Sequence, residues 1–572
     1  MGKFLLSRPL AGDASSSGPR IAFEPLMKKS ALISSAMVLL FCGACSNDPT
    51  PVTGRRAGET ENSVTGQSSG KFGVQYIPDG FGPEWLMAAD FFDSAIKPVY
   101  SKDLALMAGL GISEIKIGLG PDYGMTFGLN TTSLDTAKIQ REFQRNIGTF
   151  LADAERYGMH VVIALLTNDM YLHGPEGFYP DNKDSAGQTS NWYTRSYRGL
   201  GNEAAARMGR DLTNWENAIV GAIAASGKES VVSRYELATE VAYGILGPEW
   251  DVLSHTLVQS LLRGVAVPPS KRGMDVIWPQ EAPLLANDLR DTGVSLAFSE
   301  LHSYPGGDNP ANPDIAKGIL DIRAALPGVS VSVGEFGSSF CKNGMEGQAS
   351  ILRSSLSTAA SVNAGSLLNW GLWDYYPVND CSVRDRNDST RLGLGFSIER
   401  PRSVMGVAVE HASDLPGGDF ETGDSRWSSG AQSNGASHSR ETGDAATGQG
   451  YLRLRATQPG PAWLCSPTFA ARGSKAVVGA YVRSGEPEVS LQLHYRDAMG
   501  WSFDGRQPVV KALASGAWKF RHVQTMADKD FSITLPAGTT EAIACFVVNA
   551  PAWASEAAPI LLDLDTVGVR TF

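Results

Sequence analysis

The chain is poor in charged residues and has no basic cluster. Lysine, arginine, aspartate and glutamate make up 19% of its 572 residues, against about 25% in average proteins. The net charge is −11, and no stretch rich in lysine or arginine offsets it. Binding to a phosphate backbone needs clustered basic side chains, so we expect no nucleic-acid partner.

Cysteine is also scarce, and its spacing does not favour a zinc site. The chain has six cysteines, and the four that follow residue 45 form neither a Cys-x-x-Cys pair nor a Cys/His cluster. They fall two to each of the folded domains proposed below, which predicts one disulfide in each domain if the compartment is oxidising. The expected pairs are Cys341 with Cys381 and Cys465 with Cys545, the alternative being four buried thiols.

The apolar run near the N-terminus is too short to span a membrane. It covers residues 31–41, follows Lys28 and Lys29, and precedes Cys45, which is typical of a signal peptide. The small residues just before Cys45 resemble the lipobox of bacterial lipoproteins, which implies that Cys45 is lipidated. We therefore expect a lipoprotein of the outer membrane or cell surface, with membrane contact only through this anchor. The alternative is simple cleavage, which would give a secreted or periplasmic protein.

Composition divides the chain into four parts. Residues 1–44 are the predicted signal peptide with an N-terminal extension. Residues 45–70 are a predicted flexible linker, because their Ser, Thr, Gly, Asn and Pro leave little apolar surface to bury. Residues 71–412 alternate strand and helix patterns. Residues 413–572 show short alternating strands with Gly, Pro and Asp turns, which predicts a β-sandwich.

The pattern of residues 71–412 predicts a (β/α)8 barrel. In the clearest helix, 137–157, Ile139, Phe143 and Ile147 recur at steps of four. Eight strand and helix units in about 340 residues fit a closed barrel with insertions better than an open sheet. The predicted strands are 72–76, 114–119, 160–167, 231–240, 275–278, 295–304, 329–334 and 366–373. The predicted helices are 137–157, 203–225, 249–265, 283–291, 314–326 and 348–360.

Two glutamates stand at the predicted ends of the fourth and seventh strands, where such a barrel carries its catalytic groups. Glu240 ends the segment YELATE, and Glu335 lies in VSVGEFG. Retaining glycoside hydrolysis needs two carboxyl groups about 5–5.5 Å apart, one protonated and one ionised. The arrangement resembles the clan A glycoside hydrolases, the (β/α)8 group that includes family 5 cellulases and mannanases. The resemblance implies that Glu240 is the acid/base and Glu335 the nucleophile, with no metal in the active site.

The same resemblance implies residues that contact the sugar. In LHSY of the sixth strand, His302 would line the site and Tyr304 would hydrogen-bond the nucleophile. In NWGLWD of the eighth strand, Trp370 would be the aromatic platform beneath the sugar, with Trp373 as the alternative. Further candidate contacts, at the predicted ends of the third and fifth strands, are Asn168 and Trp278.

Two positions depart from the clan A pattern. Thr239 stands where most members have an asparagine that binds the sugar 2-hydroxyl, and we expect its hydroxyl to replace that contact. The usual second-strand arginine is missing, and Lys116 is the nearest basic residue. Glu236 and Glu300 share the strand parity of Glu240 and His302, so we expect them inside the barrel in ion or hydrogen-bond networks.

The C-terminal region carries a second resemblance. Its segments GGDFETG (417–423) and DLDTV (563–567) resemble the first and last strands of jelly-roll carbohydrate-binding modules. That resemblance implies a structural calcium ion held by Glu421 and Asp565. Tyr495 and Trp501 flank a polar turn, and we expect them to face carbohydrate. The alternative is a sandwich with a purely structural role.

These observations predict a monomeric enzyme, a retaining glycoside hydrolase of a polysaccharide or oligosaccharide. It would be an endo-glycanase or a β-glycosidase. Two alternatives stay open. One is a hydrolase of exopolysaccharide made by the same cell, and the other is a catalytically silent, carbohydrate-binding lipoprotein.

Overall fold

The computed structural model describes most of the chain from residue 71 onward. The described ranges are 71–76, 97–119, 136–166, 203–276, 278–305, 314–372, 393–431, 435–502, 508–522 and 532–572, with short gaps at 242, 244–247, 398–399, 422, 424–425 and 487. Cys45, and with it the expected signal peptide and linker, lies outside these ranges. Among the helices of the described ranges, none combines the length and hydrophobicity needed to cross a bilayer.

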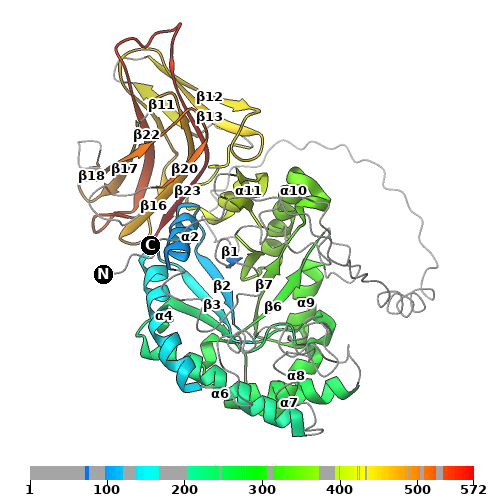
Figure 1. Ribbon diagram of the computed structural model, residues 1–572. Helices are drawn as coiled ribbons and strands as arrows, with labels where there is room; N and C mark the ends of the chain where they lie inside the picture. The colour runs from blue at the N-terminus through cyan, green and yellow to red at the C-terminus, as the bar shows by residue number, and fades with distance from the viewer. Residues whose placement is uncertain are drawn as a thin grey trace, which may run out of the picture. The chain divides into compact units, whose positions relative to one another are not determined.

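Eight parallel strands close into a barrel in chain order, from β1 to β8 (Figure 1). Parallel strands need crossover connections, and helices supply them here (Figure 1). The strands are β1 Lys71–Gln75, β2 Glu114–Gly118, β3 His160–Ala164, β4 Val232–Glu236, β5 Arg272–Gly273, β6 Phe298–Ser303, β7 Ser330–Phe336 and β8 Ser366–Trp370. The larger helices are α2 Lys97–Gly109, α4 Thr136–Arg156, α6 Ala204–Ala225, α7 Pro248–Gly264, α8 Ala282–Thr292, α9 Ile315–Ala325, α10 Phe340–Ser361 and α11 Ser403–Ala412.

The predicted (β/α)8 barrel is confirmed, with corrections to its elements. Helix α2 was not predicted, because its buried residues run through consecutive positions from Asp103 to Gly109 and leave no amphipathic period. Strand β5 is only Arg272–Gly273, before the predicted 275–278, where a single bridge pairs Val276 with Val241. Strand β4 ends at Glu236, four residues before the predicted end.

The C-terminal region is the predicted two-sheet β-structure. One antiparallel sheet has the order β11-β14-β22-β17-β18, and the other has the order β12-β13-β23-β16-β20. Small or aliphatic residues such as Leu454, Leu493 and Val569 fill the core between them. The strands are β11 Ser428–Ala431, β12 Ala436–Thr442, β13 Gly450–Ala456, β14 Gly460–Cys465, β15 Phe469–Ala470, β16 Lys475–Ser484, β17 Glu488–Asp497, β18 Gly500–Trp501, β19 Val509–Leu513, β20 Lys519–His522, β21 Ile533–Thr534, β22 Glu541–Ala550 and β23 Ile560–Thr571.

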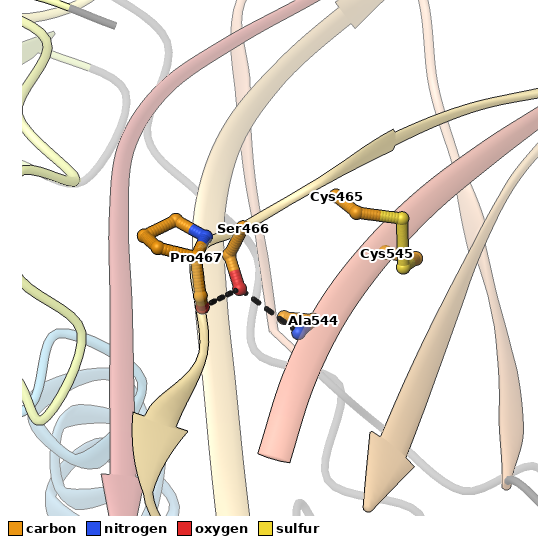
Figure 2. Close-up of a disulfide and its surroundings, with 5 residues drawn as sticks. All are labelled: Cys465, Ser466, Pro467, Ala544 and Cys545. Atoms are coloured by element: carbon orange, nitrogen blue, oxygen red, sulfur yellow. Dashed lines mark hydrogen bonds between the residues drawn. A yellow bond between two sulfur atoms is a disulfide. The ribbon is translucent and has the colours of Figure 1, made fainter. Parts of the chain in front are cut away.

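A disulfide joins two neighbouring strands of the first sheet (Figure 2). Cys465 of β14 lies directly opposite Cys545 of β22, with their Cα atoms 4.0 Å apart. Beside it, the hydroxyl of Ser466 accepts a hydrogen bond from the backbone N–H of Ala544 at 3.0 Å (Figure 2). This pairing confirms one of the two expected bridges. The other stays a prediction, because Cys381 lies outside the described residues.

The aromatic residues expected to face carbohydrate are placed differently from the prediction. Tyr495 is only 4% exposed and belongs to the core of the sandwich, so that part of the prediction is wrong. It lies in β17, whose alternate residues enter the core. Trp501 in β18 is half-buried. The most exposed tryptophan of the described residues is Trp553, at 62%, between β22 and β23.

Removal of the Cys465–Cys545 bridge should destabilise the sandwich. The two cysteines are 80 residues apart in sequence, so the bridge restricts a long loop of the unfolded chain. We expect the double variant Cys465→Ala/Cys545→Ala to lose about 2–4 kcal/mol of unfolding free energy, measured by calorimetry. Ser437→Ala, an exposed change on β12, is the control. A double variant that melts with the control would contradict the prediction.

Candidate active site

The two glutamates reach the same end of the barrel from different local structures. Glu335 belongs to β7 and is held by its strand neighbours. Glu240 follows β4 on a turn and has a positive φ of 55°, a left-handed conformation that strains a residue with a side chain. Backbone bonds hold this turn, from Thr239 N–H to Leu166 O at 2.8 Å and from Val241 N–H to Asp275 O at 3.1 Å.

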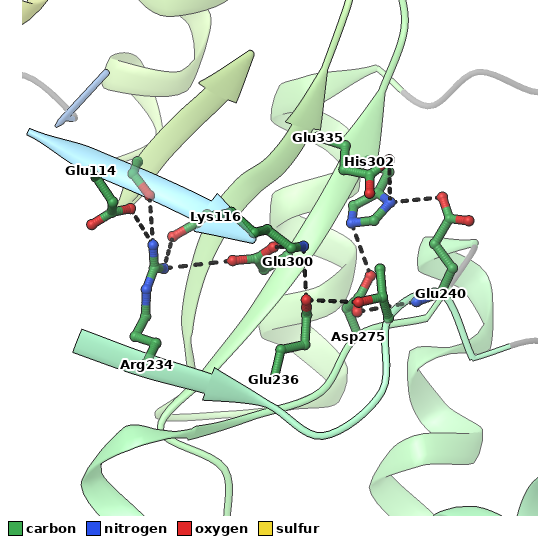
Figure 3. A network of polar contacts seen from close by, with 12 residues as sticks. Glu114, Lys116, Arg234, Glu236, Glu240, Asp275, Glu300, His302 and Glu335 are labelled. Atoms are coloured by element: carbon green, nitrogen blue, oxygen red, sulfur yellow. Dashed lines mark hydrogen bonds and ion pairs between the residues drawn. The ribbon is translucent and has the colours of Figure 1, made fainter. Parts of the chain in front are cut away.

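His302 of β6 lies between the two glutamates (Figure 3). Its Nδ1 is 2.7 Å from Oε1 of Glu240 and 3.3 Å from Oε2 of Glu335. One potential ligand atom from each of these three residues lies within 4.8 Å of the others. The sequence-predicted pair and the histidine therefore form one cluster. These three groups could also hold a cation, which glycosidase chemistry of this type does not require.

Tyr304 and Trp370 complete the described wall of the site. The hydroxyl of Tyr304 donates a hydrogen bond of 2.5 Å to Oε2 of Glu335, as the resemblance implied. The ring of Trp370, at the end of β8, packs edge-on against Tyr304 with centroids 6.4 Å apart. Trp278 is half-buried and precedes a short 3-10 helix instead of ending a strand. Asn168 and Trp373 lie outside the described residues, and their sugar contacts stay predictions.

Burial and neighbouring charge act together on the site. Burial raises the pKa of Glu335 to about 7, and the Glu240 charge adds to this, against the opposing effects of His302, Lys116 and Tyr304. Burial by itself lowers the pKa of His302, but the carboxylates of Glu335 and Glu240 raise it by more. Strongly interacting groups titrate as a unit, so the cluster retains a proton toward neutral pH.

Beneath the site, the barrel interior holds a buried ion network (Figure 3). Nζ of Lys116 is 2.7 Å from Oε2 of Glu236 and 2.7 Å from Oε2 of Glu300, and all three side chains are almost completely buried. This confirms the networks expected for Glu236 and Glu300. Burial by itself lowers the pKa of Lys116, but the charges of Glu236 and Glu300 raise it by more than burial lowers it. The ammonium group therefore stays charged. A second pair, Arg234 with Glu114, lies at the far side of the network (Figure 3).

Gly334, next to Glu335 in β7, makes room for this network. A Cβ placed on Gly334 would lie 1.7 Å from Oε2 and 2.4 Å from Cδ of Glu300. Real atoms do not approach so closely, so a side chain at 334 would displace the Glu300 carboxylate from Lys116.

Asp275 is the site residue that sequence reasoning missed. It is buried beside the β5 strand, and its Oδ2 lies 3.2 Å from Nε2 of His302. Its Oδ1 accepts a hydrogen bond from the backbone N–H of Glu240 at 3.2 Å. Burial, followed by the Glu236 charge, raises the pKa of Asp275 well above its ordinary value. The signal in the sequence is an acid inside the apolar segment MDVIW, the predicted fifth strand.

Thr239 belongs to the buried network as well. Its side chain is 3% exposed, and its hydroxyl donates a hydrogen bond of 2.8 Å to Oε2 of Glu236. The expected contact of this hydroxyl with sugar stays a prediction.

The two acids proposed for calcium are hydrogen-bonded within the sandwich. Oε1 of Glu421 accepts from the backbone N–H groups of Gln449 and Gly450, each at 3.0 Å. The Asp565 carboxyl accepts from Thr447 N–H at 2.7 Å, and burial raises its pKa to about 7. Both carboxyl groups therefore already accept hydrogen bonds from within the sandwich. Calcium at Glu421 and Asp565 stays a prediction.

No family model and no curated protein sequence matches the chain. Among solved structures, it is similar to the exo-β-1,4-mannosidase Op5Man5 from Opitutaceae bacterium strain TAV5, at 16% identity and a TM-score of 0.39, over 60% of this chain and 59% of that one. It is also similar to Pseudomonas stutzeri endoglucanase Cel5A, at 15% identity and a TM-score of 0.35, over 60% of this chain and 94% of that one.

A third structure is similar to a smaller part of the chain. It is TmCBM61 in complex with β-1,4-galactotriose, at 14% identity and a TM-score of 0.20, over 28% of this chain and 99% of that one. The chain spans less than two thirds of the mannosidase's length. At these identities and TM-scores, function has to be inferred from the site itself.

Loss of the Lys116 ammonium should destabilise the barrel strongly. Lys116→Met leaves Glu236 and Glu300 buried without their cation, and breaking a buried pair typically costs about 3–5 kcal/mol. Denaturant unfolding measures the change. Lys317→Met is the control, since Lys317 is 75% exposed in its pair with Asp321 and such pairs contribute about 0–1 kcal/mol. Equal effects of the two changes would contradict a stabilising role for the network.

The pKa shift of Glu335 predicts a pH-dependent effect on stability. A carboxyl whose pKa rises from 4.5 to about 7 on folding favours the protonated folded state, and its ionisation costs stability as pH rises between these values. Glu335→Gln should therefore raise the melting temperature relative to the unmodified chain above pH 4.5, with the gain levelling off above about pH 7. The gain should reach roughly 1–3 kcal/mol.

The control for this pH series is Glu488→Gln, at an exposed position on β17. A Glu335→Gln gain that is the same at pH 4 and pH 8 would show that the substitution acts through packing and not through proton binding.

Proposed function

We propose that this chain is a retaining glycoside hydrolase that acts on β-linked polysaccharides or oligosaccharides. The observation that carries the proposal is the Glu240–His302–Glu335 cluster, whose facing atoms lie within 4.8 Å of one another. That proximity suits double displacement, for which the carboxyl groups lie about 5–5.5 Å apart. It leaves little room for the water that an inverting enzyme places between carboxyl groups about 6.5–9.5 Å apart.

The resemblance to clan A assigns the role of each carboxyl group. The raised pKa of Glu335, about 7, does not itself select Glu335 as the nucleophile. Glu335, oriented by the Tyr304 hydroxyl, attacks the anomeric carbon, while Glu240 gives its proton to the departing oxygen. This forms a covalent glycosyl–enzyme ester and releases the leaving group as an alcohol. Glu240, now ionised, takes a proton from water as the water attacks the anomeric carbon, and this breaks the ester and restores both groups. The ring of Trp370 next to Tyr304 offers an apolar face on which the sugar can stack.

The wider assignment rests on the sequence. We propose export through the segment 31–45 and a lipid anchor at Cys45, with a monomeric barrel facing its carbohydrate substrate. A hydrolase of the cell's own exopolysaccharide would use the same chemistry. One observation favours the silent, carbohydrate-binding alternative, namely that Thr239, in place of the usual asparagine, directs its hydroxyl to Glu236.

The deciding experiment is hydrolysis of a panel of β-linked polysaccharides and aryl β-glycosides by the exported chain. Glu240→Gln and Glu335→Gln should each lower kcat by at least ~100-fold, because each removes a group that acts in the transition state. Proton NMR of the first-formed product should show the β-anomer. The exposed Glu488→Gln variant should keep full activity.

Two other outcomes would change the proposal. A first-formed α-anomer would overturn retention while keeping the hydrolase. No turnover on any substrate, with polysaccharide binding retained, would favour the silent binding protein.

A further inference from the structure

Asp275 makes contacts with both sides of the proposed acid. Its Oδ1 accepts the backbone N–H of Glu240 at 3.2 Å, and its Oδ2 lies 3.2 Å from Nε2 of His302. The other nitrogen of this imidazole, Nδ1, is 2.7 Å from Oε1 of Glu240. Asp275 is therefore linked to Glu240 twice, once through the main chain and once through His302 (Figure 3).

The main-chain contact meets a local need. The left-handed conformation of Glu240, with φ at 55°, is unfavourable for a residue with a side chain and persists only where its surroundings enforce it. The main chain of Asp275 bonds the residues on either side of this turn, because its carbonyl accepts Val241 N–H and its N–H donates to Ala238 O at 3.4 Å. The Asp275 side chain adds the contact at Glu240 itself.

The contact between Asp275 and the His302 imidazole influences which ring nitrogen carries the hydrogen. Oδ2 of Asp275 lies beside Nε2 at an ion-pair distance of 3.2 Å, without hydrogen-bond alignment, and its charge favours a hydrogen on Nε2. Nδ1 is then the nitrogen that shares a proton with Glu240 over 2.7 Å. The charge of Glu236, which is paired with Lys116, acts on Asp275 and raises its pKa. The buried network is thus coupled electrostatically to the proposed acid.

We propose that Asp275 is a positioning residue for the acid Glu240: its carboxyl group fixes the left-handed turn of Glu240 and the Nε2–H form of His302. This inference rests on the proposed glycoside hydrolysis and extends it by one residue that does not touch substrate. A carboxyl group suits the role because Oδ1 accepts the Glu240 N–H while Oδ2 places no N–H₂ group against Nε2 of His302. An amide offers one acceptor, so Asp275→Asn must leave either Glu240 N–H or His302 Nε2–H facing an N–H₂ group.

The first test separates positioning of the acid from general damage. Phenyl β-glycosides need a proton on the departing oxygen, whereas dinitrophenyl β-glycosides leave readily without one. With Asp275→Asn, we expect kcat/KM for the phenyl substrate to fall about 100-fold, as for a misplaced catalytic group, and kcat/KM for the dinitrophenyl substrate to stay nearly unchanged. The ratio kcat/KM is the quantity compared because it reports departure of the leaving group, whereas kcat also includes ester breakdown, in which Glu240 acts as the base. Equal losses on both substrates would overturn the proposal.

The matched control is Asp288→Asn. Asp288 of α8 is also buried and also contacts a histidine, with its carboxyl 2.8 Å from Nδ1 of His255, but it lies outside the cluster. It should lower stability without changing the ratio of the two kcat/KM values. If Asp275→Asn does not fold, His302→Gln tests the same link from its other end, with the same selective loss expected.

The second test needs no substrate. In chain labelled with ¹⁵N-histidine, with the His302 signal assigned by its loss in His302→Gln, Nε2 should be protonated in the unmodified chain and should lose that proton in Asp275→Asn. An unprotonated Nε2 in the unmodified chain would overturn the proposal. Absence of turnover by the unmodified chain with the expected ¹⁵N signals would refute the hydrolase and keep Asp275 as the group that orients His302.

Discussion

The charge of Lys116 is the constraint on which the centre of the barrel depends. An ammonium group at this depth is stable only because Glu236 and Glu300 approach it to 2.7 Å from two other strands. Barrels of this type usually fill the same layer with branched aliphatic side chains. Here the layer is held by hydrogen bonds that have direction, so β2, β4 and β6 are fixed in rotation as well as in distance.

The active-site cluster is continuous with that layer. Glu236 pairs with Lys116 and accepts the Thr239 hydroxyl, and its charge raises the pKa of Asp275, which lies next to His302. The imidazole then stands between the two glutamates with its pKa raised by their charges. The protonation of the cluster is therefore set partly by residues that no substrate can reach. A small rotation of one strand would therefore change the hydrogen bond between Glu240 and His302.

The sequence was sufficient for the architecture and for the main residues of the site. Alternation of strands and amphipathic helices predicted the closed barrel, and parallel strands bring Glu240, His302 and Glu335 to one end of it. The sequence could not show α2, whose continuous burial hides any period. It also could not show Asp275, because the role of this residue comes from a pairing across β4 and β6 and from a left-handed turn at Glu240, neither of which leaves a local pattern.

Gly334 constrains which residues can evolve at positions 300 and 116. The space that a Cβ would fill there is taken by the Glu300 carboxylate, which in turn is needed by Lys116. A relative that gains a side chain at 334, adjacent to the proposed nucleophile, must move the acid at 300 away from the lysine. A relative that replaces the acid by a small apolar residue is free to gain a side chain at 334, but leaves the lysine at 116 with Glu236 as its remaining partner of this pair. Covariation among these positions would thus record which barrels of this lineage have an ionic centre.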